Sequence, residues 1–235
     1  MEKREKWIDY TKLFACVLVV VGHLLQGLNK ANIQWNSDLY EYIDNFIYIF
    51  HMPLFMCLSG YLYAKLTKIS NIKEYELFIK KKFINFSIPY VVFYVAYVVI
   101  NMIFSSSVNS QNGMQSILNI LTNPMPPFWF LYALFLIFVL VPIVEKICKR
   151  NTCVVFAVFV LLHLLEIFVS TPIYAINIVC QYGVYFYLGK VVLENIKKIN
   201  LDIKIVMVNI VVFTILGLIY SYIVKEQILN IKYIS

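Results

Sequence analysis

Seven stretches of mainly apolar residues, most of them about as long as a membrane-spanning helix, dominate this chain of 235 residues. A backbone in lipid must pair its polar groups within its own segment, which favours helices. Since 61% of the residues are hydrophobic and 14% charged, a soluble fold of this size could not cover its surface with polar groups. The sequence predicts an all-α bundle of about seven transmembrane helices, over residues 10–28, 42–64, 83–105, 128–147, 152–170, 173–193 and 203–224.

The basic residues predict the topology. Of the 20 Lys and Arg residues, 17 lie in the N-terminal arm or in the second, fourth and sixth connections between these stretches. Because Lys and Arg concentrate in cytoplasmic loops, we expect a cytoplasmic N-terminus and a multi-pass protein whose surroundings are lipid. The net charge of +7 does not indicate a nucleic-acid partner, since the basic residues sit between apolar runs and form no aromatic-interleaved stripe.

The remaining patterns predict one membrane domain over residues 1–235, without repeats or low-complexity segments. Residues 105–127 are uncharged and rich in Asn, Ser and Pro, so we expect an external loop there. The five cysteines form no CxxC pair and no complete disulfide framework. Three histidines and few intramembrane carboxylates show no metal-ligand spacing, so no metal is expected. The sequence does not indicate an oligomeric state.

Two histidines fall inside apolar stretches, where ionisable groups are costly and usually face a protein interior or a wet cavity. His23 follows Leu13 by ten residues, roughly 15 Å along a helix, which is near mid-depth. His51 lies at a similar depth in the next, antiparallel stretch, close to Pro53. The two imidazoles could share one polar cavity; the alternative is a pair of core histidines hydrogen-bonded to backbone or hydroxyl groups.

Other charged residues mark the expected cytoplasmic side. Asp9 and Lys12 are three residues apart at the inner mouth of the first stretch, and Lys12 precedes His23 by about three helical turns, so both project from one side. Lys12 could equally be an interfacial anchor. Lys80, Lys81 and Lys82 form a cluster that topology alone could explain, or that could bind the phosphates of a charged donor.

Several motifs resemble one family. The run WIDYTKLFACVLVVVGH, ending in Gly22-His23, resembles the first span of membrane acyltransferase family 3, the bacterial O-acyltransferases. FHMPLFMCLSGYL, from Phe50 to Leu62, is similar to the FHMPLFFFLSGY signature of its fucose O-acetylase-like branch. Further similar pieces are Ile88-Pro89-Tyr90, Phe128-Trp129-Phe130-Leu131 and Tyr187-Leu188-Gly189-Lys190. The resemblance covers about residues 5 to 190, and the pieces occur in the family's order.

This resemblance implies a membrane-bound O-acyltransferase of a bacterial plasma membrane that moves an acetyl or similar group from acetyl-CoA to a hydroxyl of an envelope sugar or polysaccharide precursor. It implies that His23 is the catalytic base and that His51 and Trp129 line the site. Lys12 falls where much of the family has Arg, and keeps the charge without the bidentate fork. Asp9, Lys12, His51 and Trp129 are therefore the candidate substrate-binding residues, and Lys80, Lys81 and Lys82 the candidate donor-phosphate site. The family has about ten spans, so we expect this chain to be a truncated member.

The chemistry suits an imidazole. A sugar hydroxyl is a poor nucleophile, and a neutral histidine within hydrogen-bonding distance can take its proton as it attacks the thioester. His51, or a backbone amide freed beside Pro53, could stabilise the oxyanion. Two alternatives stay open: a transporter, although duplicated halves are not evident, and an inactive remnant of the enzyme. A seven-span receptor is disfavoured by the cytoplasmic N-terminus.

Overall fold

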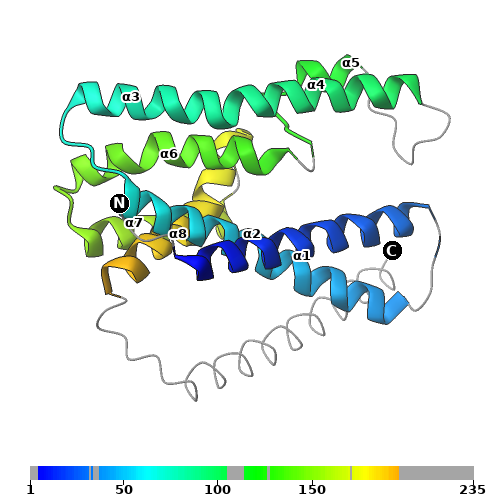
Figure 1. The fold of residues 1–235 in the computed structure, drawn as a ribbon, viewed down its shortest axis with the longest axis horizontal. Coiled ribbons are helices and arrows are strands. Elements are labelled where there is room, and N and C mark those ends of the chain that lie inside the picture. The colour runs from blue at the N-terminus through cyan, green and yellow to red at the C-terminus, as the bar shows by residue number, and fades with distance from the viewer. Residues whose placement is uncertain are drawn as a thin grey trace. The chain divides into compact units, whose positions relative to one another are not determined.

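A computed structural model describes residues 5–31, 33, 37–104, 114–125, 128–169 and 171–195. These ranges contain helices and no strand, which confirms the predicted all-α class. In chain order (Figure 1) the elements are α1 (Lys6–Lys30), α2 (Ser37–Leu66), α3 (Ile72–Lys82), the π-helical turn η1 (Phe83–Ser87), α4 (Ile88–Ile103), α5 (Met114–Leu118), α6 (Trp129–Ile147), α7 (Thr152–Phe168) and α8 (Tyr174–Asn195).

Four helical segments in the described ranges are long and apolar enough to cross a bilayer: Lys6–Lys30, Ile43–Leu66, Ile72–Ile103 and Trp129–Ile147. They match the first four predicted spans. The fifth predicted span is the shorter apolar helix α7, of 17 residues, and the sixth coincides with α8, of 22 residues. The seventh, 203–224, lies outside the described residues.

The charged connection before the third span differs from the expectation, because it is helical from Ile72 onward. Asn71 starts α3: its side chain accepts a hydrogen bond from the backbone N–H of Glu74 at 2.9 Å. The Glu74 carboxylate in turn accepts from the backbone N–H of Ser70 at 2.6 Å. Side chains that satisfy the first free N–H groups in this way stabilise a helix start. From there α3, η1 and α4 follow one another without a gap up to Ile103.

The chain divides into two compact units, and the division falls inside α2, just after Pro53. Unit 1 comprises residues 1–55 and 195–235, of which α1 and the first part of α2 are described. Unit 2 comprises residues 56–194. The prediction of one domain over the whole chain stays a prediction.

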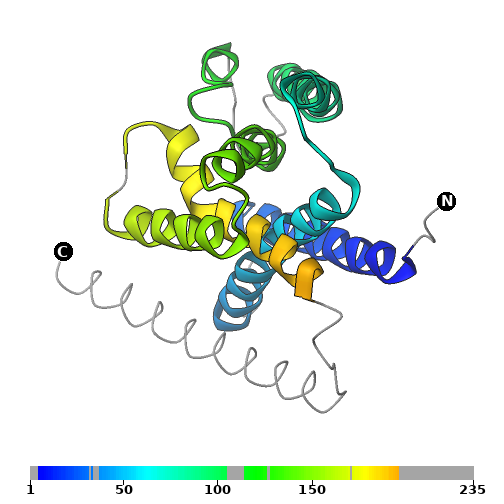
Figure 2. The ribbon, with the colours of Figure 1, turned by 90° about the vertical axis from the view of Figure 1, so that its left-hand side faces the viewer.

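Unit 2 is organised around α6. Figures 1 and 2 show α6 lying beside the stretch from α3 to α4, and α3, η1 and α7 all contact it. Its Ile137, Phe138 and Val141 are buried, together with Phe159 of α7 and Phe186 of α8. This apolar core holds the second half of α2 and α8 together as one body.

Glycines allow α2 and α8 to cross at backbone distance. A Cβ added at Gly60 would lie 1.7 Å from the carbonyl oxygen of Phe186, and one added at Gly189 would lie 1.9 Å from that of Cys57. The Cys57 thiol also donates to the Tyr185 carbonyl at 3.0 Å. The Ser-Gly and Leu-Gly-Lys motifs therefore have a packing role, since only glycine fits at such a crossing.

The predicted external loop contains a short helix, α5, and is held by tyrosines. The Tyr94 hydroxyl donates to the Ser116 carbonyl at 2.8 Å, and that of Tyr132 donates to the Leu121 carbonyl at 2.9 Å. Tyr90 donates in the same way to Ile120. These bonds to α4 and α6 order residues 116–121 within unit 2.

Candidate active site

His23 lies on α1 directly after a glycine that lets α1 approach α2. A Cβ at Gly22 would lie 3.2 Å from Ile47 Cγ2 and 3.2 Å from Tyr48 Cε2. Because Gly22 has no side chain, the ring of Tyr48 can lie close to α1. There it meets the His23 ring edge-on, with ring centroids 6.5 Å apart at an interplanar angle of 82°. The half-buried His23 therefore faces an aromatic ring of α2 on one side.

The same tyrosine links the two predicted histidines. Tyr48 meets His51 edge-on as well, with centroids 4.9 Å apart at 81°. His23 and His51 thus flank one phenol ring within unit 1. That they share a polar cavity stays a prediction. Tyr48 was not foreseen, although a phenol one turn before His51 is visible in the sequence.

The hydrogen bond of His51 determines what this ring can offer. His51 Nδ1 lies 2.5 Å from the backbone carbonyl oxygen of Ile47, and the residue is buried, with 2% of its surface exposed. Because a carbonyl only accepts, Nδ1 carries the proton, and Nε2 of the neutral ring is an acceptor. Nε2 of a neutral His51 can therefore accept a hydrogen bond from a hydroxyl, and it cannot stabilise an oxyanion.

Pro53 does not supply the expected amide either. The helix α2 runs through Pro53 from Ser37 to Leu66 without a break. A proline inside a helix removes a donor, so the group it frees is the carbonyl four residues earlier, at Ile49. A freed carbonyl can accept a hydroxyl or a cation, but it repels an oxyanion.

Two further polar residues join this cluster and were missed by sequence reasoning. Asp44 lies on α2 one turn before Tyr48, and it interacts electrostatically with His23. Gln26 of α1 makes a side-chain hydrogen bond to the Asp44 carboxylate. A signal was available, because Asp44, Tyr48 and His51 are spaced by four and three residues and so share one helix face.

The other candidates of unit 1 lie at the opposite end of α1. Asp9 and Lys12 are both half-buried, and eleven residues separate Lys12 from His23. Three turns of helix bring Lys12 and His23 to nearly the same face, but about 16 Å apart along the axis. Their substrate-binding role stays a prediction.

Unit 2 holds the remaining candidates. Trp129, the first residue of α6, packs against Tyr182 with ring centroids 5.0 Å apart. Lys80 and Lys81 are exposed in the last turn of α3. Lys82 differs, because its ammonium lies 3.8 Å from the centroid of Phe138 and within 5.5 Å of those of Phe78 and Phe86. Of the three lysines, Lys80 and Lys81 therefore present their charge to a ligand most freely.

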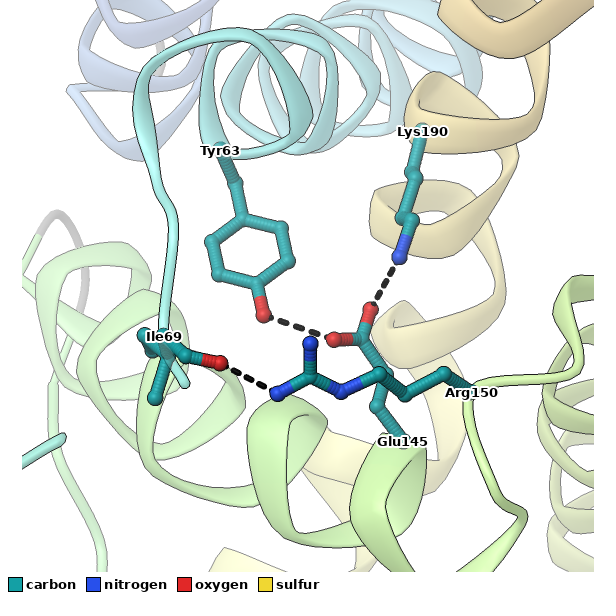
Figure 3. A network of polar contacts seen from close by, with 5 residues as sticks. All are labelled: Tyr63, Ile69, Glu145, Arg150 and Lys190. Carbon is teal, nitrogen blue, oxygen red and sulfur yellow. Dashed lines mark hydrogen bonds and ion pairs between the residues drawn. The ribbon is translucent and has the colours of Figure 1, made fainter. Parts of the chain in front are cut away.

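A polar network near the end of α6 uses Lys190, the lysine of the Leu-Gly-Lys motif (Figure 3). Glu145 accepts from Lys190 Nζ at 2.6 Å and from the Tyr63 hydroxyl at 2.9 Å. Arg150, in the following turn, donates to the carbonyl of Ile69. The side chains of Lys190 and Glu145 are 15% and 12% exposed. The network joins α2, α6 and α8, which indicates a structural role for Lys190.

Within the described ranges, no group of three or more His, Cys, Asp or Glu side chains could hold a metal ion. The expectation that the protein uses no metal stays a prediction.

Comparison with known proteins gives one family and two relatives. The acyltransferase domain family Acyl_transf_3 matches residues 5–234. The nodulation protein NolL of Sinorhizobium fredii is 44% identical over 61 residues, which are 25% of this chain and 16% of that protein. NolL of Mesorhizobium japonicum is 43% identical over 61 residues, 25% of this chain and 15% of that protein. The matched stretch is thus a small part of these relatives. No solved structure matches.

Proposed function

Because this chain belongs to the Acyl_transf_3 family of acyltransferase domains, we propose that it is a membrane-bound O-acyltransferase acting on a sugar hydroxyl. The proposed donor is acetyl-CoA or a similar acyl-CoA, and the proposed acceptor is a sugar or polysaccharide precursor of a bacterial envelope. The observation that carries the proposal is the cluster of His23, Tyr48 and His51 on α1 and α2. The fucose O-acetylase-like branch, the truncation and the plasma-membrane location belong to the same proposal.

In the proposed reaction, His23 is the general base. The acceptor hydroxyl oxygen attacks the thioester carbonyl carbon as its proton passes to a ring nitrogen of His23. The tetrahedral intermediate then collapses, the carbon–sulfur bond breaks, and the proton returns from His23 to the departing thiolate. The products are the sugar ester and CoA with a free thiol, and His23 is neutral again.

His51 has a separate part in this scheme. Since Nδ1 donates to Ile47, Nε2 of the neutral ring accepts a hydrogen bond from a hydroxyl of the acceptor. Sugars carry several hydroxyls, so an acceptor nitrogen close to the base can select which one reaches it. The oxyanion donor is a different group, since the geometry of His51 disfavours it for that task.

The donor is proposed to use the lysines at the end of α3. The phosphates of a CoA thioester are attracted to Lys80 and Lys81, both exposed, more readily than to Lys82, whose ammonium contacts aromatic rings. Trp129 remains the proposed apolar contact for a substrate, and Asp9 and Lys12 the proposed polar ones.

The first test is acyl transfer by the full chain in membrane vesicles, with radiolabelled acetyl-CoA and a panel of hexose and deoxyhexose acceptors. His23→Ala should lower transfer at least 100-fold, because general-base catalysis contributes roughly 10²–10⁴-fold. His163→Ala is the matched control: this half-buried imidazole bonds the Gln181 carbonyl at 3.0 Å, and its loss should leave the rate within twofold.

Three outcomes would contradict the proposal. Full activity in His23→Ala removes the base. Uptake of an acceptor into vesicles without ester formation indicates a transporter. A wild-type chain that folds and transfers no acyl group to any acceptor in the panel indicates an inactive remnant.

A further inference from the structure

Asp44 is a charged residue placed where charge is costly. It lies in the segment Ile43–Leu66, which is long and apolar enough to cross a membrane. Its oxygen Oδ1 is buried and has no hydrogen-bond partner within the described residues, while Gln26 makes a hydrogen bond to the carboxylate. A buried carboxylate oxygen that is left unpaired is destabilising, so its retention calls for a function.

Two contacts of the helix pair bring Asp44 close to His23. Tyr48, one turn after Asp44 on α2, places its ring beside that of His23. Gln26, three residues after His23 on α1, makes a side-chain hydrogen bond to the Asp44 carboxylate. His23 therefore lies opposite Tyr48, and Asp44 lies diagonally across from His23, opposite Gln26.

The charges around His23 favour the same partner. Asp44 is the acidic group and Lys30 the basic group that interact electrostatically with His23 among the described residues. On the α2 side, Tyr48 and His51 lie beside this locus, and Tyr40, one turn before Asp44, interacts electrostatically with Tyr48. Tyr48 contacts His23 through its ring, and the Nδ1 proton of His51 is engaged by Ile47. Among the described residues, Asp44 Oδ1 is a buried acceptor of this cluster that has no partner.

A base of this kind needs such an acceptor. Neutral imidazole has one N–H and one lone pair, and only the lone pair can take the substrate proton. A carboxylate that accepts the N–H fixes the tautomer and stabilises the imidazolium that forms, and an amide in its place favours the wrong tautomer. Oδ1 is unpaired in this structure, so a contact with His23 needs a rotation of one of the two side chains. We propose that Asp44 is a positioning residue for His23, and that Oδ1 then accepts the ring N–H, which leaves the other nitrogen free to act as the base. The catalytic part of this inference rests on the proposed function.

Nitrogen-15 NMR of the full chain in lipid tests the contact without any substrate. The chain has three histidines, so uniform histidine labelling gives three imidazole signals, and His23→Ala identifies the one from His23. At a pH where the rings are neutral, His23 should show a single tautomer. Asp44→Asn should convert it to a mixture or to the other tautomer, whereas Asp44→Glu should retain the original one.

Glu76→Gln is the matched control, because it removes one carboxylate from an exposed position on α3. It should leave the His23 signal unchanged. An unaltered tautomer in Asp44→Asn overturns the inference. If Asp44→Asn also shifts the signals of His51 and His163, which would indicate a wider structural change, Asp44→Glu decides: a lost tautomer overturns the inference and a retained one supports it.

Kinetics of acyl transfer then test the role in catalysis. Asp44→Asn should lower kcat at least tenfold while KM for both substrates stays within threefold, and Asp44→Glu should restore part of the rate. A large rise in KM with kcat unchanged overturns the positioning role. Absence of transfer by the wild-type chain overturns the proposed function instead, and leaves the NMR result on the contact standing.

Discussion

Glycines permit close helix contacts in two regions of this protein, and the two contacts differ in what opposes the missing side chain. At Gly22, where α1 meets α2, the nearest atoms are the side-chain carbons of Ile47 and Tyr48, 3.2 Å from an added Cβ. At Gly60 and Gly189, where α2 meets α8, they are backbone carbonyl oxygens at 1.7 and 1.9 Å. Side chains can rotate away, whereas helix backbone cannot.

The contact between α1 and α2 can therefore adjust to a small change, whereas the crossing of α2 and α8 cannot. The polar residues His23, Tyr48 and His51 lie at the contact whose neighbours are side chains, where small adjustments are possible. The crossing of α2 and α8 lies in unit 2, among buried aromatic rings and close to the Glu145 network. Substitutions should therefore change activity in the first region and folding in the second.

The largest effect is expected for Gly60→Ala and Gly189→Ala. A methyl group pressed into a backbone carbonyl forces the helices apart, so the cost should reach or exceed roughly 3 kcal/mol, the upper end of ordinary overpacking. The measurement is the yield and thermal midpoint of the chain in detergent. Gly27→Ala is the control, because nothing lies within 4 Å of its added Cβ. Near-normal midpoints for both crossing variants would contradict the close approach.

An intermediate effect is expected for Glu145→Ala. It removes the acceptor of the Tyr63 hydroxyl and the partner of Lys190, and breaking a largely buried ion pair costs roughly 3 kcal/mol. Since replacing both charges by apolar groups is often neutral, Glu145→Leu combined with Lys190→Met should recover much of the loss in unfolding free energy. A double variant as unstable as Glu145→Ala would show that the pair is not the cause.

The smallest effect on folding, and a clear one on catalysis, is expected for Gly22→Ala. Alanine favours the helix by about 1 kcal/mol, which offsets the tightened contact with Ile47 and Tyr48. The added methyl displaces the Tyr48 ring by a few tenths of an ångström, so acyl transfer should fall several-fold while the thermal midpoint stays within a few degrees. If acyl transfer and the thermal midpoint both fell, Gly22 would behave like Gly60 and Gly189, and the proposed difference between the two regions would be wrong.

The sequence predicted the helices better than their ends. Long apolar runs located α1, α2, α4, α6, α7 and α8, because burial in lipid requires such runs. It missed α3 because charges were taken to mark a connection, although Asn71 and Glu74 carry a helix-start signal. It missed α5 as well, because bonds from Tyr94 and Tyr132 to backbone carbonyls, formed at long range, have no local pattern.

The sequence named two residues of the candidate site but not their neighbours, and the roles of both residues stay predictions. His23 and His51 were found through their cost in an apolar stretch and through the motifs around them, and the family assignment agrees with those motifs. Asp44 was overlooked because a carboxylate near the end of a span resembles a boundary residue. The tautomer of His51 could not be foreseen, since it depends on the ring turning back to Ile47.

The continuous helical stretch from Ile72 to Ile103 has 32 residues and is therefore about 48 Å long. The hydrocarbon layer is about 30 Å thick, and the 21 residues from Phe83 to Ile103 match it. The 11 residues of α3 then extend beyond the hydrocarbon layer, and Lys82, at the end of α3, has its ammonium 3.8 Å from the ring centroid of Phe138. The boundary between α3 and η1 is therefore the expected edge of the hydrocarbon layer along this helix.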